Sequence, residues 1–380
     1  MGLWHAGLLG AVGRALEDRG YRCLFALPDP VLARAVVGPA ARVVPAPVYV
    51  PPGAALPADL QTTTFADVLG AAGFGDRAVL DALTGSWDAL LELARPAVVV
   101  ADHAPALLAA ARGRAPVVAL GLGFTTPEPA LPRFPALHDG AAGSYDEGRV
   151  LAVVNAVLAA RGAPTLLRLP ALWDVGARFV TVLPDFDPYH PVRAAPALGP
   201  VRPLPPDPAP LGGEAVFAYL AGDDPRAASL LAALARRGPV RAVVREGLPA
   251  AARDACERAG VVLERGLVDL DAALAAADVV VHHGGVGTAE AAVFAARPQL
   301  LLPRHLEHRW NAHVLASRGV GVALPDGSDA ALDRALSALR SPAARDAAAA
   351  WAPVAAAQVE PDAAEIVAAR AAALAEVWAA

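Results

Sequence analysis

Two hydrophobic patterns alternate along most of this chain. Short runs rich in Val, Leu and Ala have the length of buried strands, and longer segments between them carry apolar residues three and four positions apart, as in helices. This alternation predicts parallel, doubly wound α/β sheets. The clearest predicted strands cover residues 23–27, 97–101, 116–120, 215–220, 240–244, 278–281 and 299–302.

The pattern is interrupted once by a stretch dense in proline, between residues 198 and 213. A chain of 380 residues is also long enough for two domains. We therefore expect an N-terminal Rossmann-like domain over 1–200, a Pro-rich linker over 201–213 and a C-terminal Rossmann-like domain over 214–355. Residues 356–380 are expected to form a helical tail that packs back on the N-terminal domain. Ligands of such sheets bind at the carboxyl ends of the strands, so both domains are expected to face one cleft.

Composition narrows the classes of function. Hydrophobic residues make up 56% of the chain and charged residues 18%, which is enough for large cores. A net charge of −6 without a long basic run disfavours nucleic-acid binding. Cys23 and Cys256 lie in different predicted domains, which fits a reducing compartment. No apolar run reaches the ~20 residues of a membrane span. A cytoplasmic protein without a transmembrane segment or signal peptide is expected.

The most informative stretch is a glycine-rich turn that follows the strand at 278–281. Its sequence, His-His-Gly-Gly-Val-Gly-Thr, covers residues 282–288, and an Ala-rich helix is predicted over 289–296. Backbone N–H groups and the positive end of the helix dipole attract anions at such a position. Glycine also lets the backbone approach a phosphate closely. The alternative is a strand–helix turn that merely requires glycine.

The C-terminal motifs occur together in a known family. The run DVVVHHGGVGTAEAAVFAARPQLLLP, then Glu307-His308, Asn311-Ala312 and Gly319-Val320-Gly321, resembles the donor-binding segment of GT-B nucleotide-sugar glycosyltransferases. That group includes UDP-glycosyltransferases and antibiotic glycosyltransferases. The resemblance implies a GT-B fold of two Rossmann-like domains. It also implies an inverting, metal-independent transfer from a UDP- or dTDP-sugar to a small, apolar acceptor, with no resident cofactor.

The resemblance assigns donor contacts to this half of the chain. The diphosphate would be bound by His283 and by the backbone around Gly284, Gly285, Gly287 and Thr288. Glu290 would hold the ribose, Glu307 and His308 would face the sugar, and Asn311 would be a further donor-binding residue. Only Ala289 separates Thr288 from Glu290, where the family has two residues, and one residue turns a helical side chain by ~100°. The alternative for Glu290, Glu307 and His308 is a solvated surface position.

The same resemblance places catalysis in the N-terminal half. His5 would be the general base and Asp102, at the end of a predicted buried strand, would orient it; His103 is an alternative for either role. Neutral imidazole can remove a hydroxyl proton, and a carboxylate stabilises the imidazolium that forms. Two further interpretations remain open: a related nucleotide-sugar epimerase, and a catalytically degenerate protein that binds a nucleotide sugar or assists a partner glycosyltransferase.

The sequence of the N-terminal half contains no candidate for the first strand of its sheet. The helix that includes His5 starts within the first residues, and no strand is predicted before it. The first strand of a doubly wound sheet is a central one. Either translation starts upstream of Met1, or the domain is built in an unusual way.

Overall fold

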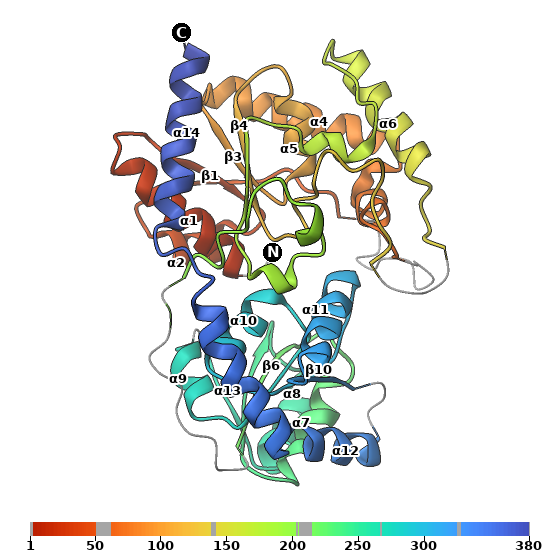
Figure 1. The fold of residues 1–380 in the computed structure, drawn as a ribbon, viewed down its shortest axis with the longest axis vertical. Helices are drawn as coiled ribbons and strands as arrows, with labels where there is room; N and C mark the ends of the chain where they lie inside the picture. The colour runs from red at the N-terminus through yellow and green to blue at the C-terminus, as the bar shows by residue number, and fades with distance from the viewer. Residues whose placement is uncertain are drawn as a thin grey trace. The chain divides into compact units, whose positions relative to one another are not determined.

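The computed structural model describes residues 3–50, 62–137, 142–202, 204, 215–266, 268–324 and 328–379. Contacts within the chain divide it into two compact units, drawn in Figure 1. Unit 1 combines Met1–Arg202 with Glu360–Ala380, and unit 2 is Pro203–Val359. Most of the predicted linker at 201–213 lies outside the described residues. Across the described ranges, we find no helix with both the length and the apolar character that a membrane crossing requires.

Unit 2 is built on one parallel sheet with the strand order β11-β10-β9-β6-β7-β8. The chain starts in the middle at β6, winds outward through β7 and β8, then returns to β9 on the other side. Ligands of doubly wound sheets bind where the order reverses, here between β6 and β9. The strands are β6 Val216–Ala221, β7 Val240–Arg245, β8 Val261–Leu263, β9 Val279–His282, β10 Gln299–Leu301 and β11 Gly321–Ala323.

Helices cover both faces of this sheet, which explains why its strands are almost continuously apolar. Successive side chains of a strand point to opposite faces. Val279 and Val281 accordingly pack with Leu231 and Leu332, whereas Val280 packs with Leu274 on the other face. The helices are α7 Ala227–Ala235, α8 Ala250–Arg258, α9 Leu270–Ala275, α10 Val286–Phe294, α11 Leu306–Ser317, α12 Asp329–Leu339 and α13 Pro342–Ala356.

The described residues of unit 1 form two separate parallel sheets. One pairs β1 Leu24–Leu27 with β2 Arg42–Pro45, and the other has the order β3-β4-β5, over Val99–Asp102, Val117–Gly121 and Ala177–Val180. The α-helices of the unit are α1 Leu3–Glu17, α2 Pro30–Val37, α3 Phe65–Leu69, α4 Arg77–Ala94, α5 Pro105–Ala111, α6 Glu147–Ala160 and α14 Ala363–Ala379. Its short 3-10 helices cover Leu169–Trp173, Pro184–Phe186 and His190–Val192.

The C-terminal helix α14 belongs to unit 1 and lies along α1 (Figure 1). Val367 and Ala371 of α14 pack with Leu8 and Val12 of α1 and with Val118 of β4 in one buried cluster. The two helices therefore cover the same face of the β3-β4-β5 sheet.

Two stretches before α4 are shaped by local polar and proline residues. Helix α3 and a π-helix, Gly70–Phe74, directly precede α4. A capping box between Thr64 and Asp67 starts α3, and so short a helix has too few turns to show its period. The described residues 48–50 form no strand, because Pro45 and Pro47 interrupt the backbone pairing after β2.

Candidate active site

The glycine-rich turn connects β9 to α10 at the carboxyl edge of the unit 2 sheet. Gly284 has a φ of +96°, and a Cβ there would lie 2.9 Å from the backbone oxygen of His308. The carbonyl of Gly284 accepts a hydrogen bond from Nδ2 of the buried Asn311, at 2.8 Å. Asn311, a predicted donor-binding residue, therefore holds the turn in place. This tight turn requires glycine at position 284.

The turn ends in an open helix N-terminus. Gly285 is the N-cap of α10, and glycine has no side chain that could cap this end. The first backbone N–H groups of a helix have no partner inside the helix. Gly287 and Thr288 lie in this first turn and are half-buried, so they reach the surface. Helix α10 begins three residues earlier than predicted, which places both residues within the helix and gives the turn an anion-binding geometry.

His282 is a buried structural residue. Its Nε2 bonds the Gln299 side-chain oxygen at 2.8 Å, and its Nδ1 accepts the Gly284 N–H at 3.1 Å. Burial lowers the pKa of His282 to about 4. The imidazole is therefore neutral near pH 7, and its hydrogen bond with the Gly284 N–H holds the backbone of the turn in place.

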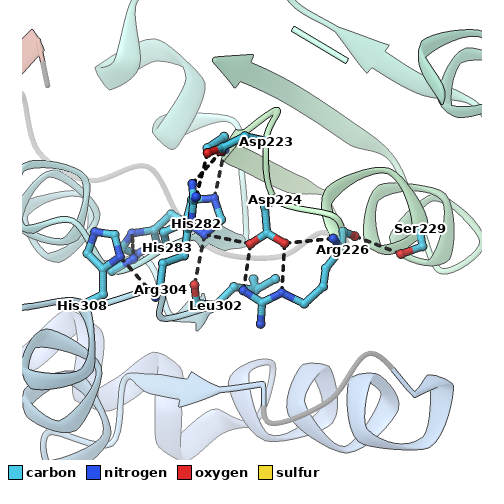
Figure 2. Close-up of polar contacts among 11 residues, drawn as sticks. Asp223, Asp224, Arg226, Ser229, His282, His283, Leu302, Arg304 and His308 are labelled. Atoms are coloured by element: carbon cyan, nitrogen blue, oxygen red, sulfur yellow. Dashed lines mark hydrogen bonds and ion pairs between the residues drawn. The ribbon is translucent and has the colours of Figure 1, made fainter. Parts of the chain in front are cut away.

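His283 bonds protein groups through both ring nitrogens, as Figure 2 shows for its contact with Leu302. Nδ1–H donates to the Leu302 carbonyl at 3.0 Å, and Nε2 accepts the N–H of Ala221 at 2.9 Å. Burial lowers the pKa of His283, which favours this neutral form. The ring thus connects the ends of β6, β9 and β10. A contact between His283 and a diphosphate requires one of these two hydrogen bonds to open.

Two ion pairs flank His283, and sequence reasoning missed them (Figure 2). Arg304 binds both oxygens of Asp223 at 2.7 and 2.8 Å. Arg226 binds both oxygens of Asp224 at 3.0 and 2.8 Å, and Asp224 lies 3.7 Å from Nδ1 of His283. Asp223 and Asp224 follow β6, the neighbour of β9, so their place after a predicted strand was the available signal.

These carboxylates are charged at neutral pH. Hydrogen bonds from Arg304 hold the pKa of Asp223 below its usual range. Burial alone would raise the pKa of Asp224, but the hydrogen bonds from Arg226 outweigh it and leave the pKa lowered. The site therefore places two guanidinium groups, each neutralised by one carboxylate, beside the glycine-rich turn.

The remaining predicted donor residues differ in exposure. Glu290 is fully buried, because its position on α10 faces the interior, so the alternative of a solvated carboxylate is wrong. Its contact with a ribose stays a prediction and requires this side chain to become accessible. Glu307 and His308 are half-buried in the first turn of α11. The His308 ring is stacked on that of His283, with centroids 6.2 Å apart, and burial lowers its pKa far below the usual range.

Unit 1 brings together two residues that are 97 positions apart in the sequence. His5, in the first turn of α1, bonds Asp102, the last residue of β3, with 2.7 Å between Nδ1 and Oδ2. The Asp102 side chain is fully buried and that of His5 is 17% exposed. The adjacent His103 is exposed, with its ring centroid 6.4 Å from that of His5. His5, rather than His103, therefore occupies the position oriented by Asp102.

In the described part of the chain, no group of three or more His, Cys, Asp or Glu side chains has an arrangement that could hold a metal ion. Cys23 and Cys256 are free and belong to different units.

The whole chain is similar to solved glycosyltransferase structures. The kitacinnamycin glycosyltransferase aligns with a TM-score of 0.66 and 20% identity over 97% of this chain and 96% of its own. The glycosyltransferase VinC, solved in complex with dTDP, aligns with a TM-score of 0.64 and 20% identity over 99% and 98% of the two chains. The chain has the GT-B fold. The fold expected from the sequence is thereby confirmed.

Sequence comparison supports the GT-B assignment in the C-terminal part of the chain. Residues 251–373 match the model of the erythromycin biosynthesis protein CIII-like C-terminal domain, a range that includes the glycine-rich turn and α11. Glycosyltransferase GtfC of Amycolatopsis orientalis is 39% identical over 57 residues, which cover 15% of this chain and 14% of that relative. The chain thus matches about one seventh of the curated relative's length.

Proposed function

We propose that this GT-B protein is an inverting glycosyltransferase that moves a sugar from a nucleoside diphosphate to a small, apolar acceptor. In this proposal the enzyme uses neither a metal nor a resident cofactor, and the UDP- or dTDP-sugar is a substrate. The hydrogen bond between His5 and Asp102 carries the proposal, because a binding protein has no need of an oriented base. The two free cysteines fit action in a reducing compartment such as the cytoplasm.

His5 and Asp102 have the arrangement of a base and the group that orients it. Asp102 accepts the proton on Nδ1, so Nε2 is the basic nitrogen. In the proposed reaction Nε2 takes the proton of the acceptor hydroxyl as its oxygen attacks the anomeric carbon. The bond between that carbon and the diphosphate oxygen breaks, and the configuration is inverted. Asp102 stabilises the imidazolium until its proton passes to solvent.

The leaving diphosphate gains negative charge, and the β9–α10 turn offers fixed dipoles for it. Backbone N–H groups at the start of α10 lower the energy of that charge because they are already oriented. Arg226 and Arg304 supply positive charge beside the turn. In our proposal the diphosphate competes with Asp223 for Arg304, since phosphate oxygens suit the same bidentate geometry. The solved complex of VinC contains dTDP, which supports dTDP as the first candidate.

A donor-by-acceptor screen tests the proposed transfer. Purified protein is incubated with UDP- and dTDP-sugars and apolar hydroxyl compounds, and mass spectrometry detects the mass of the attached sugar. We expect His5→Ala to lower kcat about 10²–10⁴-fold, because general base catalysis is lost, while dTDP or UDP affinity stays unchanged. If His5→Ala retains the wild-type rate, His5 is not the base.

A catalytically degenerate donor-binding protein is the second candidate. It is favoured by His283, whose ring nitrogens both bond the protein, and by the burial of Glu290. This function predicts saturable binding of a nucleoside diphosphate without transfer or hydrolysis of any nucleotide sugar in the screen. Product formation that depends on His5 would exclude it.

A further inference from the structure

Unit 1 contains a large apolar cavity between its two sheets. The cavity has a volume of about 460 Å³ and is lined by residues 23–26, from β1 and the residue before it, and by residues 96–102, which include β3. Among the described strands, β1 pairs with β2 and β3 pairs with β4, so each has one unpaired edge. The cavity therefore separates the edges of two parallel sheets.

Helices already cover this cavity from both sides. Leu9, Val12 and Leu16 of α1 line it, and so do residues of α4 and α5. Val98 and Val100 pack against the cluster that contains α1, so the neighbouring Val99 and Ala101 point to the opposite face. The layer between the helices is the position of a sheet, and none of the described strands occupies this part of it.

The chemistry of the cavity favours a strand over a small apolar molecule. An edge strand presents a row of unpaired backbone N–H and C=O groups. Buried backbone groups nearly always have hydrogen-bond partners. An apolar acceptor would fill the volume without satisfying either edge, whereas a strand satisfies both.

We propose that this cavity is the seat of a β-strand that leads directly into α1 and joins the two sheets into one. The contact between His5 and Asp102 places the first turn of α1 at the carboxyl end of β3. A strand parallel to β3 would end at that same edge, where α1 begins. The first strand of a doubly wound sheet is a central one, which is the position of this cavity.

The occupant is thus a segment of this chain that precedes residue 1. At about 3.3 Å per residue, a segment of about four or five residues is long enough to pair with the four-residue strands β1 and β3. Because both faces would be buried, the segment should be a continuous run of Val, Ile and Leu without proline. The proposal stands on the cavity and the strand edges, so it is independent of the proposed glycosyl transfer.

Three full-chain forms test the proposal by amide hydrogen exchange. The first starts at Met1, the second carries an added run of five valine and isoleucine residues and a Gly-Ser turn before Met1, and the third has proline in the middle of that run. We expect the apolar extension to slow exchange at residues 24–27 and 98–102 at least tenfold and to raise the Tm. The proline form should do neither.

Equal exchange at these amides in the first two forms would overturn the proposal, and so would equal protection by the proline form. Slower exchange caused by an apolar hydroxyl compound in the unextended chain, but not by the extension, would make the cavity an acceptor site instead. The codons directly upstream of Met1 give a second test. They should encode an in-frame apolar run without proline, and a stop codon or a polar run there would contradict the assignment.

Discussion

At the scale of single residues, the β9–α10 turn depends on glycine at position 284. Ala at this position must adopt a left-handed backbone, with its Cβ 2.9 Å from the His308 oxygen. We expect Gly284→Ala to lower the free energy of unfolding by about 1–3 kcal/mol and to weaken nucleotide binding. Gly285→Ala is the matched control, because φ is −61° there and the nearest atom to a Cβ lies 3.7 Å away. Equal urea midpoints for the two variants would contradict this account of the turn.

The buried His282 makes stability depend on pH. Its folded pKa, about 4, is below the ordinary value near 6.5, so the unfolded chain binds more protons between these values. Stability therefore falls as the pH is lowered through this range. From pH 7 to pH 5 we expect His282 to remove about 2 kcal/mol from the free energy of unfolding.

Urea denaturation of wild type and His282→Asn at both pH values measures this contribution. The variant should be less stable at pH 7, because Asn does not reproduce both ring contacts, but it should lose less stability on acidification. His283, whose pKa is also lowered, accounts for part of the remaining slope. The same loss in both proteins would show that His282 does not titrate as described.

The sequence predicted some site residues and missed others for physical reasons. His5 and Asp102 were paired from the resemblance, and the structure brings them within 2.7 Å. Arg304 and Asp223 were missed because their contact joins loops 81 residues apart, and neither lies in a glycine-rich motif. The sequence also did not predict that the Glu290 side chain points inward, because this direction depends on where α10 begins and on what packs against it.

At the scale of elements, a buried ionic network holds the loop after β4. Arg193 binds Asp187 with 2.7 Å between Nε and Oδ2, and it donates to the carbonyls of Gly123 and Thr126 at 3.1 and 2.6 Å. The side chains of Arg193 and Asp187 are almost fully buried. The network therefore ties this loop to the segment after β5.

Removing Arg193 should destabilise unit 1 strongly. Arg193→Met leaves the Asp187 charge buried without its partner, and we expect a loss of about 3–5 kcal/mol in the free energy of unfolding. Arg236 in unit 2 offers a control, because its contact with Asp329 is exposed. Arg236→Met should change stability by about 1 kcal/mol or less. Similar losses for the two variants in urea denaturation would contradict the role given to the buried network.

Elements with a clear pattern of buried apolar residues could be predicted from the sequence. Elements that depend on local polar contacts could not. The strands of unit 2 are apolar on both faces because helices cover both, so their sequence alone indicated them. Helix α3 depends on the capping box of Thr64 and Asp67 and is too short for a period. Strands β1 and β3 belong to different sheets, and this separation cannot be predicted from the sequence of either strand alone.

At the scale of the whole molecule, the proposed reaction uses residues of both units. In this proposal unit 1 provides the oriented His5, and unit 2 provides the turn, the helix N-terminus and the guanidinium groups for the donor. The proposed strand seat also lies in unit 1. Each of these assignments can be tested separately. Donor binding tests unit 2 alone, transfer requires both units, and hydrogen exchange at β1 and β3 tests the strand seat.

Calorimetric titration with dTDP and UDP tests the central claim, that unit 2 binds a nucleoside diphosphate at the β9–α10 turn. We expect saturable heat from at least one nucleotide. Arg304→Ala should weaken that binding about 10–100-fold, the effect of losing hydrogen bonds to a charged group. Arg236→Ala, which removes an exposed arginine elsewhere in unit 2, should leave it unchanged. No saturable heat from either nucleotide with the wild-type chain would contradict the donor site.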